Sequence, residues 1–425
     1  MRPLFVTGFA PVLALASLAA TTAVRAEDKP DTGVPEFSIA QDMPYDAARA
    51  SMAASGIKYG LNYTGEYYDV TSGGLSRGST YNGLIEVYTD IDLEKLLGWK
   101  GAAIHANAFY VHGKGPTAKT GSTFAVSNLE GYETFRLDEL WLEQSLLGDK
   151  LKVKVGSIAA DTMFFISDTA AVFLNGTFGW PGILASNTIA GGPGYPLTSM
   201  GAVVTYTPNE QLTLMGAVFN GSPADPYAAN PQRANNHGTD FRFGDGELML
   251  LEGAYKYEFG GLGGTVKVGG WKQFNAPDGI YTDFRSGAPV NSDYGIYGII
   301  DQTIWKSGDD KNVTVFGRIS GSPSDRSKMD FYFDTGILFT GFVPGRAKDT
   351  LGAAFGYGQI SDDLIQANAD PSSLRTYESV LEINYLAHIR NGISLAPDFQ
   401  YFWNPGAVAD VGHAAVWGAR LKVSY

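Results

Sequence analysis

The residues with the clearest chemical potential are charged and aromatic side chains that recur at every second position of short segments. Glu139, Trp141 and Glu143, for example, would share one face of an extended segment. Carboxylates, amides and cations hydrogen-bond to hydroxyl groups, and aromatic rings contact apolar C–H faces, so this combination suits a hydroxylated solute. The candidate binding or constriction residues are Glu66, Glu86, Glu139, Trp141, Glu143, Lys154, Asn175, Trp180, Arg318, Glu378, Glu382 and Asp398.

Patterns that would indicate catalysis or a metal are absent from the sequence. There is no cysteine, and the 5 histidines lack metal-ligand spacing. No zinc-protease, nucleophile-elbow or nucleotide-binding motif occurs, so we expect no catalytic residue, metal or cofactor. The net charge of -13 argues against a nucleic-acid partner. An enzyme with a Ser/His/acid set is the alternative from another class; His388 and Ser394 lie near each other in sequence, but nothing marks them as such a set.

The elements that must position these residues are extended segments with one apolar and one polar face. In 415–425, for example, Trp417, Leu421 and Val423 alternate with Arg420 and Lys422. About sixteen such segments are predicted, an even number as in single-chain bacterial barrels. They are 58–69, 82–92, 101–111, 134–146, 150–157, 199–207, 211–219, 247–258, 264–274, 293–305, 312–320, 329–340, 349–359, 376–388, 393–402 and 414–425.

The connections between these segments alternate between long and short. This rhythm is typical of an antiparallel transmembrane β-barrel with external loops and short periplasmic turns. In hydrocarbon every backbone polar group must be paired within the protein, so the sheet must close. The sequence therefore predicts an all-β barrel in a Gram-negative outer membrane, with membrane lipid as one partner. A large secreted all-β domain is the alternative.

Three parts of the chain are expected. Residues 1–26 read as a cleaved signal peptide, with Arg2 before an apolar run and Val24-Arg25-Ala26 before the cleavage point. A membrane anchor is the alternative, but the run is short for a spanning helix. Residues 27–57 form a periplasmic arm with a short helix over 44–55, and residues 58–425 form the barrel.

The longest connection, 158–198, is expected to fold into the barrel and narrow it. It is too apolar for a solvated loop, since it contains Phe164, Phe165, Phe173, Phe178 and Trp180. These rings would either face a passing solute or pack the connection against the wall. In 134–146 the alternation is ambiguous around Arg136, Asp138 and Glu139, which indicates a β-bulge.

Several stretches of the sequence are similar to a known family. They are Leu93-Glu94-Lys95-Leu96-Leu97-Gly98-Trp99-Lys100-Gly101, Leu140-Trp141-Leu142-Glu143-Gln144, Val172-Phe173-Leu174-Asn175-Gly176, Ala396-Pro397-Asp398-Phe399-Gln400-Tyr401 with Asn404-Pro405-Gly406, and Gly345-Arg346 with Asp349. On these, the chain resembles the carbohydrate-selective porins of the OprB type.

The resemblance implies a 16-stranded pore through which small sugars diffuse passively. A general or ion-selective diffusion porin and an outer-membrane barrel enzyme are the alternatives. The preferred sugar, the charge selectivity, the state as a monomer or a homo-oligomer, and the position of the arm relative to the lumen stay open. The last residue, Tyr425, departs mildly from the phenylalanine that usually ends such barrels.

Overall fold

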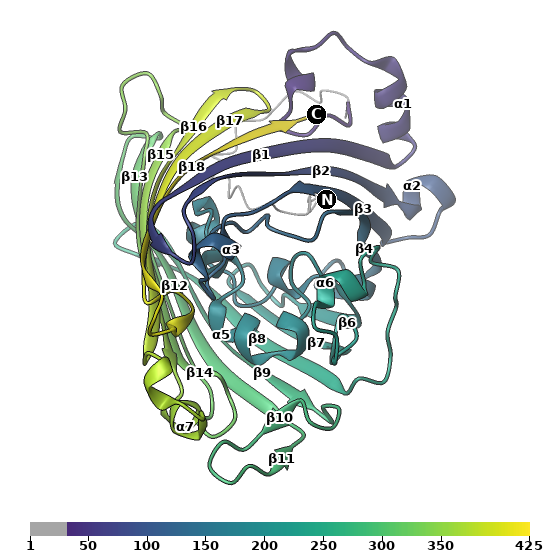
Figure 1. Ribbon diagram of the computed structural model, residues 1–425. Helices are drawn as coiled ribbons and strands as arrows, with labels where there is room; N and C mark the ends of the chain where they lie inside the picture. The colour runs from purple at the N-terminus through teal and green to yellow at the C-terminus, as the bar shows by residue number, and fades with distance from the viewer. Residues whose placement is uncertain (1–31) are drawn as a thin grey trace.

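Sixteen antiparallel strands close into one barrel in the computed structural model, which describes residues 32–425 (Figure 1). Strands adjacent in the chain are neighbours, and the first strand pairs with the last. The strands are β1 Ile57–Gly74, β2 Gly78–Asp92, β3 Ala102–Gly113, β4 Thr134–Leu146, β5 Leu151–Ile158, β6 Ser199–Tyr206, β7 Leu212–Asn220, β8 Glu247–Phe259, β9 Leu262–Phe274, β12 Asp293–Ser307, β13 Lys311–Gly321, β14 Met329–Thr340, β15 Thr350–Ile360, β16 Tyr377–Arg390, β17 Ile393–Trp403 and β18 Gly412–Ser424. The predicted fold class is confirmed.

The strands alternate between an apolar outer face and an inner face that is polar as predicted, except where apolar wall residues pack against an inward-folded connection. On β18, Trp417 and Leu421 are exposed on the outer face, whereas Arg420 is directed inward and bonds to Glu66 of β1. The barrel closes where β18 meets β1, for example at Arg420 opposite Glu66. Closure pairs the backbone groups of both edge strands, which a lipid environment requires.

The helices are short and lie in the connections or before the first strand. They are α1 Ala47–Ala54, α2 Leu93–Leu97, α3 Thr117–Thr120, α4 Gly176–Gly179, α5 Gly182–Asn187, α6 Pro231–Ala234 and α7 Asp362–Ala367, with 3-10 turns η1 Ile39–Asp42, η2 Ala160–Thr162, η3 Thr169–Val172, η4 Ile189–Gly191, η5 Pro371–Ser373 and η6 Pro405–Ala407. A small hairpin of β10 Tyr281–Thr282 and β11 Pro289–Val290 lies between β9 and β12. In the described part of the chain, no helix has the length and apolar character needed to cross a membrane.

The segment before β1 packs on the rim of the barrel at the end that carries the short turns. Helix α1 begins after Asp46, whose carboxylate accepts from the amides of Ala48 and Arg49. The Arg49 guanidinium lies 4.7 Å from the centre of the Tyr59 ring and 4.9 Å from that of Tyr425. These contacts hold α1 beside the first and last strands. The predicted signal peptide, 1–26, lies outside the described residues.

Two connections fold into the barrel: loop 2 (residues 114–133) and loop 3 (residues 159–198). Figure 1 shows their helices α3 and α5 inside the ring of strands. Phe164, Phe165, Phe173 and Phe178 of loop 3 are at most 2% exposed and belong to one apolar cluster. That cluster includes wall residues of β6 to β9 and β12 to β18, such as Phe219, Leu250, Phe316 and Phe402. The main apolar core therefore lies inside the barrel, between loop 3 and this part of the wall.

Candidate channel constriction

Strand β4 carries three of the candidate residues and has the predicted irregularity. Its ladder with β3 pairs Leu140 with Ala106 and Leu137 with Ala108, so one additional residue of β4 is accommodated between these pairs. Asp138 and Glu139 are both buried at this bulge. The Glu139 carboxylate accepts from the amide of Ala159 at 3.0 Å, which fixes the first residue of loop 3.

The next inward positions form a mixed aromatic and charged cluster that stays partly exposed. The Lys154 ammonium lies 3.8 Å from the centre of the Trp141 ring, and the His105 ring stacks on Trp141 at 5.0 Å. Glu143 pairs with Lys152 at 3.2 Å, with side chains 21% and 32% exposed. These groups lie on β3 to β5, where Trp141 and Lys154 border loop 3 and Glu143 and Lys152 bond to neither loop in the described contacts.

Glu378 and Glu382 of β16 bind the backbone of the inward-folded loops. Glu378 accepts from the amide of Thr123 in loop 2 at 2.9 Å. Glu382 accepts from the amides of Leu174 and Asn175 in loop 3 at 2.7 and 2.9 Å. Both carboxylates are 0% exposed. Their placement makes them fasteners of the loops rather than open lining of the lumen.

Asn175 and Asp398 lie beside these fasteners. The side-chain nitrogen of Asn175 donates to the side-chain oxygen of Gln400 on β17 at 2.9 Å. The side-chain oxygen of Asn175 accepts from the backbone amide of Thr177. Asp398 accepts from the same Gln400 at 2.8 Å and is 3% exposed. The structure therefore brings Glu382, Asn175 and Asp398 together, under the loop.

Arg318 of β13 also binds loop 3 and is 2% exposed. Its guanidinium donates to the carbonyls of Thr177 and Phe178 at 2.9 Å each and to that of Phe165 at 3.0 Å. Asp334 completes its surroundings with an ion pair at 2.5 Å. One arginine thus joins two turns of the loop to the wall, because its planar fork satisfies several carbonyls at once.

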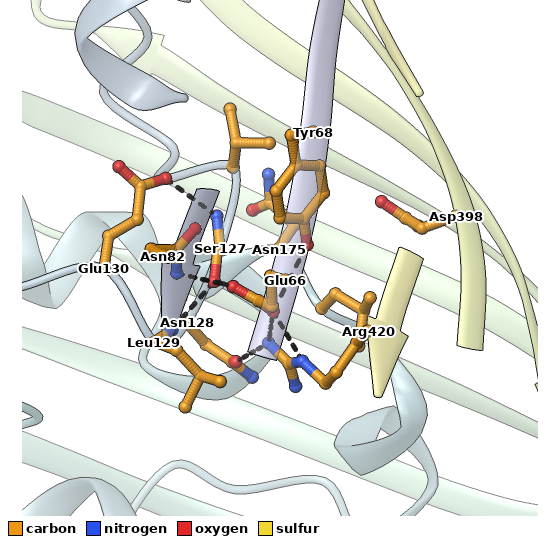
Figure 2. Close-up of polar contacts among 12 residues, drawn as sticks. Glu66, Tyr68, Asn82, Ser127, Asn128, Leu129, Glu130, Asn175, Asp398 and Arg420 are labelled. Carbon is orange, nitrogen blue, oxygen red and sulfur yellow. Dashed lines mark hydrogen bonds and ion pairs between the residues drawn. The ribbon is translucent and has the colours of Figure 1, made fainter. Parts of the chain in front are cut away.

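Glu66 and Arg420 join loop 2 to the place where the barrel closes. Figure 2 shows the Glu66 carboxylate between Asn82, Ser127 and Arg420, which bind it at 2.7, 2.5 and 2.5 Å. Arg420 also donates to Asn128 of loop 2 at 2.5 Å. Glu86 lies on β2 four residues after Asn82, nearer the end of the strand that leads into α2. It accepts from Asn62 at 2.7 Å and bonds to neither loop in the described contacts.

Trp180 and the phenylalanines of loop 3 pack the loop instead of lining a passage. The Trp180 indole N–H donates to the carbonyl of Gly191 at 2.8 Å. Its ring lies so close to Gly194 that a side chain there would be 3.3 Å from it. Of the two alternatives that the sequence leaves for these rings, the structure favours packing against the wall, because the apolar rings are withdrawn from water there.

Three further wall residues fasten loop 3 but escape detection in the sequence. Glu252 accepts from the amide of Phe165 at 2.9 Å, and Asp301 from the hydroxyl of Ser167 at 2.5 Å. Lys267 donates to the carbonyl of Ile166 at 2.7 Å. Their inward position follows from the alternation of side chains along the strands. The apolar character of loop 3 was the one signal that inward residues on this wall would bind it.

Two loop carboxyls have unusual electrostatics. Burial raises the pKa of Glu130 in loop 2 to about 7, although hydrogen bonds from Thr117 and Ser127 favour its charged form. Burial likewise raises the pKa of Asp161 in loop 3 to about 7. In residues 32–425 no group of three or more His, Asp or Glu side chains is arranged to hold a metal ion.

A closed barrel of 16 antiparallel strands with loops folded into its lumen defines the class of outer-membrane porins. Residues 76–425 match the family model described as "Carbohydrate-selective porin, OprB family". The chain belongs to this family. It is a carbohydrate porin, and it resides in the bacterial outer membrane.

Individual relatives agree with this assignment. Porin B of Pseudomonas aeruginosa is 22% identical over 418 residues, which cover 89% of each chain. The high-pH structure of Pseudomonas putida OprB is similar with a TM-score of 0.76 at 21% identity, covering 89% of this chain and 96% of that one. The match to the outer-membrane channel DcaP of Acinetobacter baumannii has a TM-score of 0.51 at 10% identity and covers 87% of this chain and 98% of that one. These structures support the fold.

Proposed function

We propose that sugars diffuse passively through the part of the lumen that loop 3 leaves open, along the inward side chains of β2 to β5. The observation that carries this proposal is that the loops bury the inward side chains on one part of the barrel wall and leave those on another part exposed. Glu378, Glu382 and Arg318 are buried under the loops, whereas Asp90, Glu143 and Lys152 keep side-chain exposures of 34%, 21% and 32%. We name the inward set Asp90, Trp141, Glu143, Lys152 and Lys154 the open wall.

The open wall has the composition for a neutral, hydroxyl-rich solute. Its two carboxylates lie on β2 and β4 and its two ammonium groups on β5, where Lys154 lies opposite Glu143 in the ladder. Hydroxyl groups both donate and accept, so they can bond to either kind of charge. Opposite charges at short range also leave no extended field of one sign, which argues for sugars over ions as the preferred solutes.

Two side chains that already contact the Trp141 ring limit its role in binding a solute. Lys154 and His105 already contact that ring, so a sugar would meet Trp141 mainly at its edge. We therefore assign solute contact to Glu143 and Lys154 first. Glu66, Glu139, Asn175, Arg318, Glu378, Glu382 and Asp398 would act indirectly, by holding the loops, and Trp180 by packing within loop 3. Glu86 would line the lumen beside the open wall.

The test is liposome swelling with a series of sugars and charged solutes of similar size, combined with single-channel recording. The parent should show stepwise conductance and faster swelling with sugars than with size-matched ions. Glu143→Gln with Lys154→Gln should reduce the preference for sugars while the barrel stays folded. Lys256→Gln, an exposed residue near the short-turn end of β8, is the matched control and should leave the preference unchanged. An unchanged preference in the double variant would overturn the assignment of the open wall. A protein without channel openings would instead favour the enzyme alternative.

A deletion within 164–180 probes loop 3 directly. It should raise conductance and flatten the difference between sugars and other solutes, since it removes material from the lumen. The deletion also uncovers apolar wall residues such as Phe219 and Leu250. Retained resistance of the barrel to detergent must therefore be checked first. Unchanged conductance in a folded deletion variant would place the constriction elsewhere.

A further inference from the structure

A hollow on the outside of the barrel, at one rim, has no part in the channel. Its volume is about 260 Å³, and it is lined by Phe339, Phe342, Val343, Asp349, Leu351 and Tyr385. Phe339, Leu351 and Tyr385 are successive cross-strand neighbours on β14, β15 and β16. We name this hollow the rim groove.

The rim groove opens toward the membrane. Leu338 and Gly352, next to Phe339 and Leu351 in the chain, point inward, because Gly352 lies against Phe173 of loop 3. Side chains alternate along a strand, so Phe339 and Leu351 point outward. Phe342, Val343 and Leu351 are 44%, 41% and 44% exposed. The groove is thus continuous with the lipid-facing surface of the barrel.

The groove lies at the periplasmic end. It contains residues of the turn between β14 and β15, nine residues from Gly341 to Asp349. The same rim carries the four-residue turn from Leu147 to Lys150 and the contacts of α1 with Tyr59 and Tyr425, whereas loops 2 and 3 enter from the other rim. Short turns of bacterial barrels face the periplasm. The groove consequently faces the inner leaflet, which is the phospholipid leaflet.

An arginine is held at the polar end of the groove. The Arg346 Nε donates to Asp349, whose side chain is only 2% exposed. Asp349 is fixed by the hydroxyl of Tyr385 at 2.6 Å and by the amide of His388 at 3.0 Å. The Arg346 side chain is 37% exposed, and a guanidinium has five donor hydrogens. A second donor binds the carbonyl of His388 at 3.3 Å, which leaves the remaining donors of the guanidinium for a second oxyanion, and the neighbouring Lys348 is exposed.

Aromatic residues complete the edge of the groove. The ring of Phe342 lies 5.7 Å from that of Phe339 and 5.5 Å from that of Trp305. Aromatic rings are enriched where a membrane protein meets the headgroup region. The rim groove therefore combines an apolar hollow, an aromatic edge and an oriented cation within one short turn.

We propose that the rim groove binds one phospholipid of the inner leaflet, with an acyl segment in the hollow and the phosphate at Arg346. The hollow is somewhat smaller than the roughly 300–1,000 Å³ of ligand pockets, so it accommodates part of one chain and not a whole lipid. Guanidinium groups bind phosphate oxygens in a planar, bidentate manner, which suits the orientation that Asp349 imposes. Gly345-Arg346 and Asp349 are among the positions at which the sequence resembles its family, and none of them lines the lumen.

The test is native mass spectrometry of the intact protein, released from detergent after titration with a phosphatidylglycerol or a phosphatidylethanolamine. One saturable phospholipid should remain bound to the parent. Val343→Trp fills the hollow, and Arg346→Gln removes the cation; each should weaken retention of that lipid about tenfold or more. Lys150→Gln, in the turn between β4 and β5, is the matched control and should retain it as the parent does.

Each variant is first checked for an intact barrel by its mobility on a detergent gel before and after heating. Val343→Trp leaves the Arg346–Asp349 pair in place, so it tests the groove even if Arg346→Gln disturbs the turn. Equal retention in the parent, Val343→Trp and the control would overturn the proposal. Retention by many lipids without saturation would overturn it too, as would a dimer that Val343→Trp dissociates, since the occupant would then be a second copy of the chain.

Discussion

The fastening of loop 3 by Glu382 leads to a quantitative prediction for Glu382→Gln. The carboxylate accepts from two buried amides, those of Leu174 and Asn175. A glutamine retains one acceptor oxygen and presents an N–H2 group to the other amide, so one buried donor loses its partner. Hydrogen bonds to charged groups contribute about 1.5–3 kcal/mol each. We expect the segment 172–177 to be destabilised locally by about 2–3 kcal/mol.

This free energy translates into a population of released loop. With 1.4 kcal/mol per factor of ten, it raises the fraction of time that the segment is detached by about 30- to 140-fold. The release stays local, because Arg318 and Glu252 still bind loop 3 near Phe165. In planar bilayers, Glu382→Gln should therefore show greater open-channel noise and a higher mean conductance than the parent.

Glu143→Gln is the comparison, since Glu143 pairs with Lys152 and bonds to neither loop in the described contacts. It removes the same charge from the lumen without loosening loop 3. We expect its current noise to match the parent. If Glu382→Gln and Glu143→Gln changed the traces equally, lumen charge alone would explain the effect, and the fastening role of Glu382 would be refuted.

Three further predictions concern the barrel and loop 2. Leu421→Arg places a cation on the exposed lipid face and should lower the free energy of unfolding by about 2–4 kcal/mol if the position lies near the bilayer midplane, whereas Lys422→Ala should fold normally. Urea titrations in vesicles would measure both variants. Equal tolerance of the two changes would contradict the register of β18. The unboiled protein should migrate differently from the boiled protein on a detergent gel, because a closed hydrogen-bonded sheet resists detergent; identical migration would argue against the closed barrel. The pKa of Glu130 is raised from 4.5 to about 7, so the folded state retains a proton that the unfolded chain has lost, and the stability of loop 2 should fall as pH rises from about 4.5 to about 7 and then stay constant. Amide hydrogen exchange in loop 2, corrected for its intrinsic pH dependence, should show this fall in the parent and lose it in Glu130→Gln; a fall that persists in the variant would exclude Glu130 as its source.

The strands were predictable because a barrel in lipid imposes a strict alternation. The pattern of Trp417, Leu421 and Val423 against Arg420 gives both the strand and its inward face. The bulge at Asp138 and Glu139 was also visible, since two neighbouring carboxylates break the alternation. Strand β1 extends to Gly74, beyond the predicted end at 69, because its last residues pair with β18 through further register shifts. The pattern of single segments contains no information about such pairing.

The hydrogen-bond partners of the inward charged residues were not predictable in the same way. Alternation gives the face on which Glu378 and Glu382 lie, but it does not reveal which backbone amides of loops 2 and 3 reach them. The partners are distant in sequence, and loop 3 has no periodicity that would set its path. The β10–β11 hairpin was missed for a related reason, since strands of two residues carry no alternation.

The bulge in β4 has a consequence for how this strand can change in length. Removing one residue from a regular strand turns every later side chain to the opposite face. Here the ladder between Leu137 and Leu140 already contains one residue more than the opposing strand. A chain without Asp138 would therefore regain a regular ladder, with Arg136 and Glu139 still directed inward and Leu140 outward. Strand β4 can thus lose this one residue while its other side chains keep their faces, although Thr198 would lose the Asp138 carbonyl that accepts its hydroxyl at 2.7 Å.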